Sequence, residues 1–186
     1  MKLILIGYRA AGKTTIGRLL AEKIGLPFID TDKLIENEAG MPLADVIQEE
    51  GWPGFRKRET KAVMSLDDKG VCVVATGGGV VLSQANTDML KKEGMLIYLK
   101  AEPGDIIERL KKDEQKEGAR PRLTDAGLES ETQAMLKQRI PLYEALADYT
   151  AQTEGKSPLQ VVDDIYVHLV ETGIVAQINK LKKTNG

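Results

Sequence analysis

The chain has 186 residues, 42% of them hydrophobic and 29% charged, with a formal net charge of -2. This length and balance are typical of one soluble globular domain with a single core. The charge provides no basic field of the kind that attracts nucleic acid or an anionic membrane, so neither is expected as a partner. The single cysteine, Cys72, excludes an internal disulfide and indicates a reducing compartment; with no signal peptide or membrane-length apolar run, we expect a cytoplasmic protein.

The first predicted elements are a buried strand over 3–6 and an amphipathic helix that ends near Gly25. Between them, residues 7–14 read Gly-Tyr-Arg-Ala-Ala-Gly-Lys-Thr, the GxxxxGKT signature of a phosphate-binding loop. A glycine-rich turn can also be a plain connector. The Lys-Thr pair and the strand and helix on either side favour the phosphate loop.

In such a loop, inward-facing backbone N–H groups and the positive end of the following helix bind phosphate oxygens. Lys13 can reach the β- and γ-phosphates, and the Thr14 hydroxyl can bind Mg²⁺. The residues expected to contact the nucleotide here are Ala10, Ala11, Gly12, Lys13, Thr14 and Thr15.

A short second strand, 28–29, is predicted to run into Asp30-Thr31-Asp32. Two carboxylates at the carboxyl end of a parallel strand belong on the ligand-binding edge of the sheet, near the phosphate loop. Alternatively, Asp32 or Thr31 only caps the next helix, 33–39.

Two further helices are predicted, a small one within 40–51 and another from Phe55 toward residue 66. Arg56 and Glu59 are three residues apart and share one face of the second helix. A run this charged is usually a solvated face, and it matters for function only if that face looks into the active site.

The strand predicted over 71–75 ends in Thr76-Gly77-Gly78-Gly79 rather than in an aspartate. Many phosphate-loop enzymes place a metal-associated aspartate at such a strand end, so Asp30 or Asp32 is expected to supply that carboxylate instead. The three glycines can present backbone N–H groups to a ligand, or they can form a flexible turn before the next helix.

The middle of the chain continues with a helix over 83–92, a strand over 95–99 and a helix over 103–112. Residues 111–127 then become polar and lose the apolar period. A long charged segment of this kind, which contains Arg120, suggests a mobile lid in a phosphoryl-transfer enzyme, although an ordinary surface loop has the same composition.

The last predicted elements are a helix over 131–148 that carries Arg139, a strand over 149–153 and a helix over 159–170. Residues 171–186 form a C-terminal tail that either adds a short helix or frays.

Strands that alternate with helices imply a parallel sheet with helices on both faces. We therefore expect a three-layer α/β/α fold with a central five-stranded parallel sheet, of the phosphate-loop NTPase type, with a mobile lid. The domain is expected to span 1–170, with an acceptor-binding region at about 31–62 and a lid at about 111–127, followed by the tail 171–186.

Together these motifs, in this order, resemble the shikimate kinase family over residues 2 to about 170. The resemblance rests on the phosphate loop and on five further motifs: Asp30-x-Asp32, Phe55-Arg56-x-x-Glu59, Gly77-Gly78-Gly79, Arg120-Pro121 and Arg139-x-x-x-Tyr143. It implies ATP- and Mg²⁺-dependent phosphorylation of the 3-hydroxyl of shikimate, giving shikimate 3-phosphate and ADP in chorismate and aromatic amino-acid biosynthesis. A monomeric enzyme is expected.

On the donor side, the resemblance implies that Thr14 binds Mg²⁺ directly and that Asp30 holds it through water. It places Arg109 and the loop from Thr153 to Pro158 near the adenine and makes Arg120 the lid arginine that closes on ATP. Lys13 and Arg120 would then neutralise charge on the transferring group.

On the acceptor side, the resemblance makes Asp32 the base for the reacting hydroxyl. Arg56 and Arg139 would clamp the shikimate carboxylate, and Glu59 would orient the site. The glycine segment completes the expected acceptor contacts, with Gly78 as backbone donor between Gly77 and Gly79. Guanidinium groups suit this role because they bind carboxylates through paired, charge-assisted hydrogen bonds.

Some positions depart from the family pattern. Ala10 stands where many members have glycine, Ile47 where an aromatic often lines the pocket, and Arg122 where leucine is usual; the lid is also slightly long. The alternatives are a related small-molecule kinase such as a gluconate kinase, or a nucleotide-binding module without turnover. A nucleoside monophosphate kinase would need more arginines around the acceptor.

Overall fold

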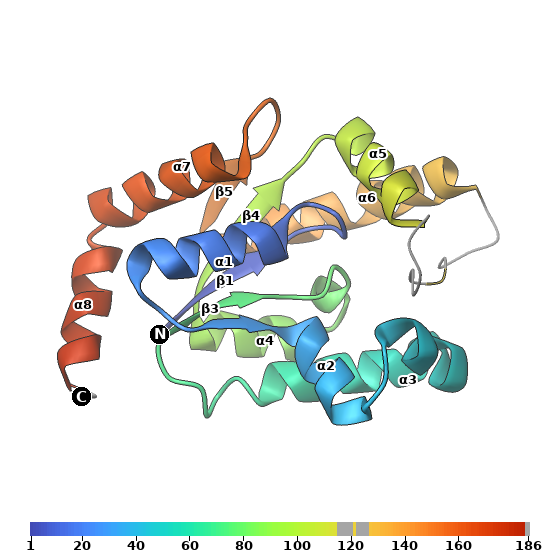
Figure 1. Cartoon of the computed structure of the whole chain (residues 1–186), viewed down its shortest axis with the longest axis horizontal. Helices are drawn as coiled ribbons and strands as arrows, with labels where there is room; N and C mark the ends of the chain where they lie inside the picture. Colours follow the sequence, from blue (N-terminus) through green and yellow to red (C-terminus); the bar gives the residue numbers. More distant parts are fainter. Residues whose placement is uncertain (115–120, 122–126, 185–186) are drawn as a thin grey trace.

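The computed structural model describes residues 1–114, 121 and 127–184. Its centre is a five-stranded, all-parallel sheet in the order β2-β3-β1-β4-β5 (Figure 1). The strands are β1 (Lys2–Ile6), β2 (Phe28–Asp30), β3 (Cys72–Ala75), β4 (Gly94–Lys100) and β5 (Tyr149–Gln152). The predicted five-stranded parallel sheet is confirmed.

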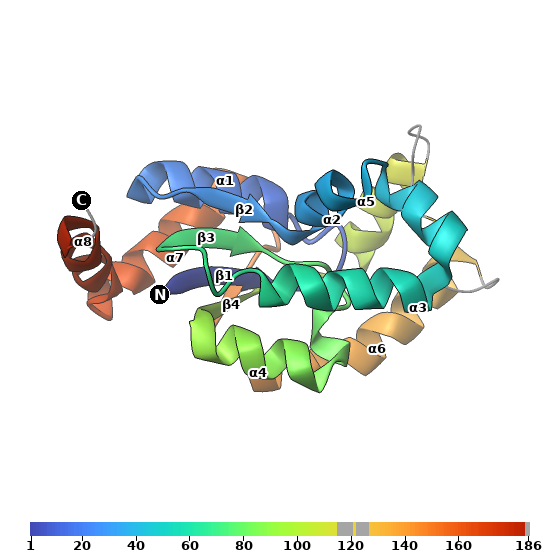
Figure 2. The same ribbon diagram turned by 90° about the horizontal axis from the view of Figure 1, so that it is seen from below.

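Helices cover both faces of this sheet, as the view from below in Figure 2 shows: α1 and α7 lie on one face, and α4, α6 and the end of α3 lie on the other. The helices are α1 (Lys13–Ile24), α2 (Thr31–Ala39), α3 (Leu43–Met64), α4 (Gln84–Glu93), α5 (Pro103–Glu114), α6 (Leu128–Leu146), α7 (Pro158–Glu171) and α8 (Ile174–Thr184), with a 3-10 turn at Val80–Leu82. The three-layer α/β/α prediction is therefore also confirmed.

Strand β1 is the middle of the sheet because it pairs with β3 on one side and β4 on the other. All five of its residues are buried, as expected for a parallel strand with helices over both faces. Its carboxyl end feeds directly into the phosphate loop. None of the helices in the described residues is both long and apolar enough to cross a bilayer.

Helix α3 is two helices joined at Gly51, whose φ of 66° and ψ of 176° are not helical. This break agrees with the two separate helices predicted for that region. Ile47 on the first half packs with Ile35, Leu43 and Phe55 in a small apolar cluster apart from the main core. The residue that replaces the usual aromatic is therefore buried in an apolar cluster that includes the Phe55 ring.

Several predicted boundaries differ from the structure. The cap of α2 is Asp30, whose side chain accepts from the Asp32 N–H at 3.0 Å, so capping by Asp32 or Thr31 was wrong. Helix α5 continues to Glu114, and α6 begins at Leu128 rather than at residue 131. Helical hydrogen bonding does not require apolar residues. The polar ends of these helices therefore could not be predicted from the spacing of apolar residues.

The predicted tail contains a helix, α8, that packs against α7. Ile178 is fully buried and belongs to the main core. The Lys182 ammonium donates to the carbonyl oxygen of Ile24, the last residue of α1, at 2.6 Å. The C-terminal segment therefore contributes to the same apolar core as the sheet.

Candidate active site

The phosphate loop connects β1 to α1 and contains three residues in backbone conformations that L side chains rarely adopt. Gly7 has φ 143°, and a Cβ there would lie 2.9 Å from the Leu99 carbonyl oxygen. Gly12 caps α1 with φ 95°. Ala10 has φ 61°, so this position accepts a methyl group in the left-handed region that glycine would occupy without strain.

Lys13, the first residue of α1, is buried beneath the loop with 8% of its surface exposed. Its ammonium donates to the carbonyl oxygens of Gly7 at 2.8 Å and Tyr8 at 2.7 Å. A fixed positive charge thus lies beside the amino-terminal end of α1, where the helix dipole already favours anions.

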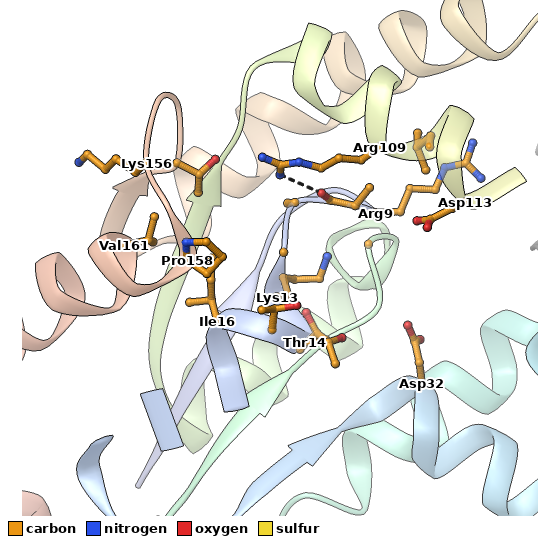
Figure 3. Close-up of a pocket in the computed structure, with 18 of the residues that line it drawn as sticks. Arg9, Lys13, Thr14, Ile16, Asp32, Arg109, Asp113, Lys156, Pro158 and Val161 are labelled. Atoms are coloured by element: carbon orange, nitrogen blue, oxygen red, sulfur yellow. Dashed lines mark hydrogen bonds between the residues drawn. The ribbon is translucent and has the colours of Figure 1, made fainter. Parts of the chain in front are cut away.

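A cavity of about 710 Å³ opens over this loop (Figure 3). Among the residues predicted to bind nucleotide or acceptor, those that line it are Ala10, Ala11, Gly12, Lys13, Thr14, Thr15, Asp32, Gly78 and Arg109. Arg109 reaches in from α5 and donates to the Ala10 carbonyl oxygen at 3.2 Å. Figure 3 shows this bond as a dashed line.

The wall opposite α5 comes from the segment between β5 and α7 and from the first turn of α7. Thr153, Lys156, Pro158 and Val161 line the cavity there. This is the stretch where the family resemblance places the adenine. The cavity therefore runs from the phosphate loop to a mixed apolar and polar wall, as a nucleotide would require.

Thr14 and Asp30 meet at one side of the loop. The Thr14 hydroxyl donates to Asp30 Oδ2 at 2.7 Å, while Asp30 Oδ1 caps α2. These are hard oxygen donors, the type that Mg²⁺ prefers. No group of three or more His, Cys, Asp or Glu side chains suited to a metal occurs in the described part of the chain, so a metal here would need water or phosphate as further ligands.

Asp32 lies in the first turn of α2, and its side chain points toward the cavity across from Thr14 (Figure 3). Gly77 lies against it: a Cβ on Gly77 would be 3.2 Å from Asp32 Oδ1 and 2.4 Å from Glu59 Oε1. A side chain at this position would force the Glu59 carboxylate to move.

Arg56 and Glu59 form an ion pair at 2.7 Å within α3, and the Glu59 carboxylate is buried. A Cβ on Gly79 would lie 2.0 Å from Arg56 Nη1, so a side chain at this position would displace the Arg56 guanidinium. The planar guanidinium lies near the rings of Trp52 and Phe55, 5.5 and 5.2 Å from their centroids. These contacts hold Arg56 beside the glycine segment.

Arg139 is a buried cation, with 5% of its surface exposed. Its guanidinium donates to the Gly78 carbonyl oxygen at 3.2 Å and lies 5.5 Å from the centroid of the Tyr8 ring. Among the described residues it has no carboxylate partner, and its Nε has no hydrogen-bond partner. The Tyr143 hydroxyl, whose pKa is strongly raised by burial, donates to the same Gly78 oxygen.

The structure thus brings the predicted acceptor residues to three consecutive glycines: Asp32 and Glu59 at Gly77, Arg139 at Gly78, and Arg56 at Gly79. Within the described residues, Arg56, Glu59, Gly77, Gly79 and Arg139 lie beside the 710 Å³ cavity rather than on its wall. The predicted Arg120 and the departure at Arg122 lie outside the described residues.

Two site residues were missed from sequence. Arg9 is a variable position of the GxxxxGKT pattern, and Glu131 is one of several carboxylates near the start of α6. The structure joins them by an ion pair of 2.9 Å across 122 positions of sequence. The available signal for Arg9 was that it is the one charged residue between Gly7 and Gly12; nothing in the sequence singles out Glu131.

The sequence model of the shikimate kinase family matches residues 9–170. A shikimate kinase of Syntrophus aciditrophicus is 40% identical over 171 residues, covering 88% of each chain. The solved structure "Shikimate kinase from Acinetobacter baumannii in complex with shikimate" superposes with a TM-score of 0.85 at 33% identity, covering 92% of this chain and 93% of that one. A gluconokinase of Sinorhizobium meliloti reaches a TM-score of 0.56 at 16% identity, a likeness of fold alone.

Proposed function

This chain belongs to the shikimate kinase family, and from that premise we propose how its own residues transfer a phosphoryl group from ATP to the 3-hydroxyl of shikimate. The enzyme is an ATP-dependent kinase. The gluconate kinase and the non-catalytic module are not favoured, because the family match covers most of the chain and the gluconokinase resembles it only in fold.

The observation that carries the acceptor assignment is that Arg139 is buried without a carboxylate partner among the residues that the structure describes. A guanidinium that is almost fully buried needs an anion, since an unpaired buried charge is strongly destabilising. Arg139 has no carboxylate partner in the described part of the chain, and it lies beside Gly78 at the edge of the cavity. The carboxylate of shikimate supplies that anion, with Arg56 as the second arm of the clamp.

ATP binds with its phosphates on the loop and its base toward the segment from Thr153 to Pro158. The loop N–H groups and the end of α1 hold the phosphate oxygens, and Lys13 stabilises the negative charge that develops on the transferring group. Arg109 lies between the loop and the base. Arg120 is assigned to the same phosphates by the family resemblance.

Mg²⁺ fits the donor set that Thr14 and Asp30 present. A site with few direct protein ligands, completed by water and phosphate, is typical of nucleotide-bound magnesium. Thr14 would bind the ion directly, and Asp30 would hold one of its waters. When bound, the ion would supply positive charge that offsets the negative charge of the phosphates.

Asp32 accepts the proton of the 3-hydroxyl as that oxygen forms a bond to the γ-phosphorus and the bond to the ADP oxygen breaks. The carboxylate is close to the loop and faces the cavity, where a general base must be. Glu59 holds Arg56 by their ion pair, so it orients the acceptor without touching the reacting atoms.

The enzyme acts as a monomer in the cytoplasm, where its donor ATP is available and a free thiol such as Cys72 stays reduced. Light scattering after size-exclusion chromatography measures the molar mass in solution and so tests whether the protein is monomeric.

A coupled ADP-release assay with shikimate, with gluconate and with no acceptor tests the function. We expect release only with shikimate. Asp32→Asn keeps the shape of the side chain and removes the proton acceptor, so turnover should fall by roughly 100- to 10,000-fold, the usual contribution of general acid–base catalysis.

Shikimate should still bind to Asp32→Asn, as measured by calorimetry. An active Asp32→Asn enzyme would remove Asp32 from the chemistry. Equal ADP release with gluconate or without an acceptor would contradict the acceptor assignment itself.

A further inference from the structure

One face of α6 contacts both the phosphate loop and the Gly78 backbone. Glu131, Met135, Arg139 and Tyr143 follow one another at a spacing of four residues, which places them on one side of the helix. At one end Glu131 binds Arg9; at the other, Arg139 and Tyr143 donate to the Gly78 carbonyl oxygen.

The Gly78 backbone in turn packs directly on the phosphate loop. A Cβ on Gly78 would lie 2.8 Å from the backbone nitrogen of Arg9 and 3.3 Å from the carbonyl carbon of Tyr8. The guanidinium groups of Arg9 and Arg139 lie 5.9 and 5.5 Å from the centroid of the Tyr8 ring, which is buried.

These contacts form a closed ring. It runs from the Arg9 backbone to Gly78, from Gly78 to Arg139, along α6 to Glu131, and from Glu131 back to the Arg9 side chain. The Glu131 carboxylate is fully buried and the Arg9 side chain is 18% exposed, so water screens this pair little. Rigid rings of buried contacts have few ways to adjust without breaking a contact.

We propose that Arg9 and Glu131 form a positioning pair, which fixes α6, and with it Arg139, relative to the phosphate loop. This role rests on the proposed function, because the pair would hold the acceptor in line with the γ-phosphate. Arg9 extends from the loop toward the end of α5, away from Lys13 (Figure 3), so it acts through position rather than on the reacting atoms. Errors of about 1 Å in such positioning cost up to roughly 100-fold in rate.

The test is a double-mutant cycle of Arg9→Ala and Glu131→Gln, with steady-state kinetics for both substrates and thermal unfolding of each variant. Each single variant should lose roughly 10- to 100-fold in kcat, and the double variant should be no worse than the poorer single one. Glu144→Gln is the matched control. It removes an ion pair of 2.8 Å to Lys100 from the same helix, outside the cavity lining, and should keep the wild-type kcat.

Losses that multiply in the double variant would show two independent roles and overturn the pair. Unfolding at lower temperature with an unchanged kcat would show a role in stability alone, and would also overturn it. If Arg9→Ala does not fold, Arg9→Lys with Glu131→Gln completes the cycle. Absence of shikimate turnover in the wild type and in Glu144→Gln would instead mean that the proposed function fails.

Discussion

Among single residues, Arg139 has the clearest requirement for a ligand. Its guanidinium is buried, donates to a backbone oxygen and to the Met135 sulfur, and has no carboxylate partner in the described residues. A planar fork held in this way can offer two parallel hydrogen bonds to an incoming carboxylate. The ammonium of a lysine cannot reproduce that geometry.

Arg139→Ala should therefore weaken shikimate binding by about 2–5 kcal/mol, the range for truncating one partner of a buried charge pair. Arg139→Lys should recover only part of this loss. Calorimetric titration with shikimate measures both. The control is Lys137→Ala, an exposed residue of the same helix, which should bind as the wild type does. Unchanged affinity in Arg139→Ala would place the carboxylate elsewhere.

Tyr98 makes the stability of the protein decrease with rising pH in the alkaline range. Burial, with a smaller contribution from the nearby charges of Glu144 and Glu102, raises its pKa to about 12, so the folded protein keeps the phenol proton. In the unfolded chain the same phenol ionises near its ordinary pKa of about 10. The stabilisation is fully present below about pH 10 and is lost as the pH rises toward 12, because the unfolded state then binds fewer protons.

Replacing Tyr98 by phenylalanine should reduce this dependence. Urea unfolding at about pH 8 and about pH 10.5 would show a smaller loss of unfolding free energy for Tyr98→Phe than for the wild type. Equal losses would mean that Tyr98 does not contribute to the alkaline decline.

Sequence reasoning worked best for residues in a contiguous motif, such as Lys13 and Thr14, because the local chain dictates their setting. It could not explain why positions 77 and 79 are glycine. Their reason is steric and comes from Glu59, Asp32 and Arg56, which lie elsewhere in the sequence. The same holds for Arg9 and its distant partner, since a close approach between segments leaves no local pattern.

At the scale of elements, α8 extends the core beyond the last predicted helix. Among the α8 residues whose burial the structure describes, 174–183, only Ile178 is fully buried, yet it joins the main apolar cluster. Lys182 adds a hydrogen bond at the carboxyl end of α1, where a cation also interacts favourably with the helix dipole.

Ile178→Ala should lower the free energy of unfolding by about 2–5 kcal/mol, the usual loss for truncating a buried isoleucine. Denaturant titration measures this, and Gln177→Ala on the exposed face of α8 is the matched control. A loss below about 1 kcal/mol would mean that the helix packs only loosely.

Helices with strong start and stop signals were predicted well. Gly51 was recognised as a boundary, and the structure shows why: its backbone lies in a region that is essentially restricted to glycine. The start of α6 was placed three residues late because its first turn is polar apart from Leu128. An apolar period cannot mark a turn that has only one apolar residue.

At the scale of the whole molecule, the parallel sheet brings the residues of the candidate site together. Strands β1, β2 and β3 end in the phosphate loop, the two aspartates and the three glycines, respectively, and all strands are parallel, so these groups meet at one edge. The topology was predictable because hydrophobic runs alternated with helical periods. The side-chain contacts across that edge were not, because they depend on how helices α3 and α6 tilt over the sheet.

Because the residues proposed to bind ATP and Mg²⁺ share this edge, removal of divalent cations should stop the reaction as a whole. With EDTA in excess, ADP release should fall to background, and added Mg²⁺ should restore it. Asp30→Asn should need more Mg²⁺ for half-maximal rate, since it loses one negative charge at the metal. Full activity in EDTA would contradict a metal-dependent mechanism.

The one thiol of this chain lies in β3, out of contact with solvent, and its pKa is raised by burial. A protonated, covered sulfur reacts slowly with maleimides and iodoacetamides. A cysteine engineered at a chosen exposed position would therefore carry a fluorophore or spin label with little background. Such a label at Lys156, which lines the cavity, would report nucleotide binding directly, without first replacing the native cysteine.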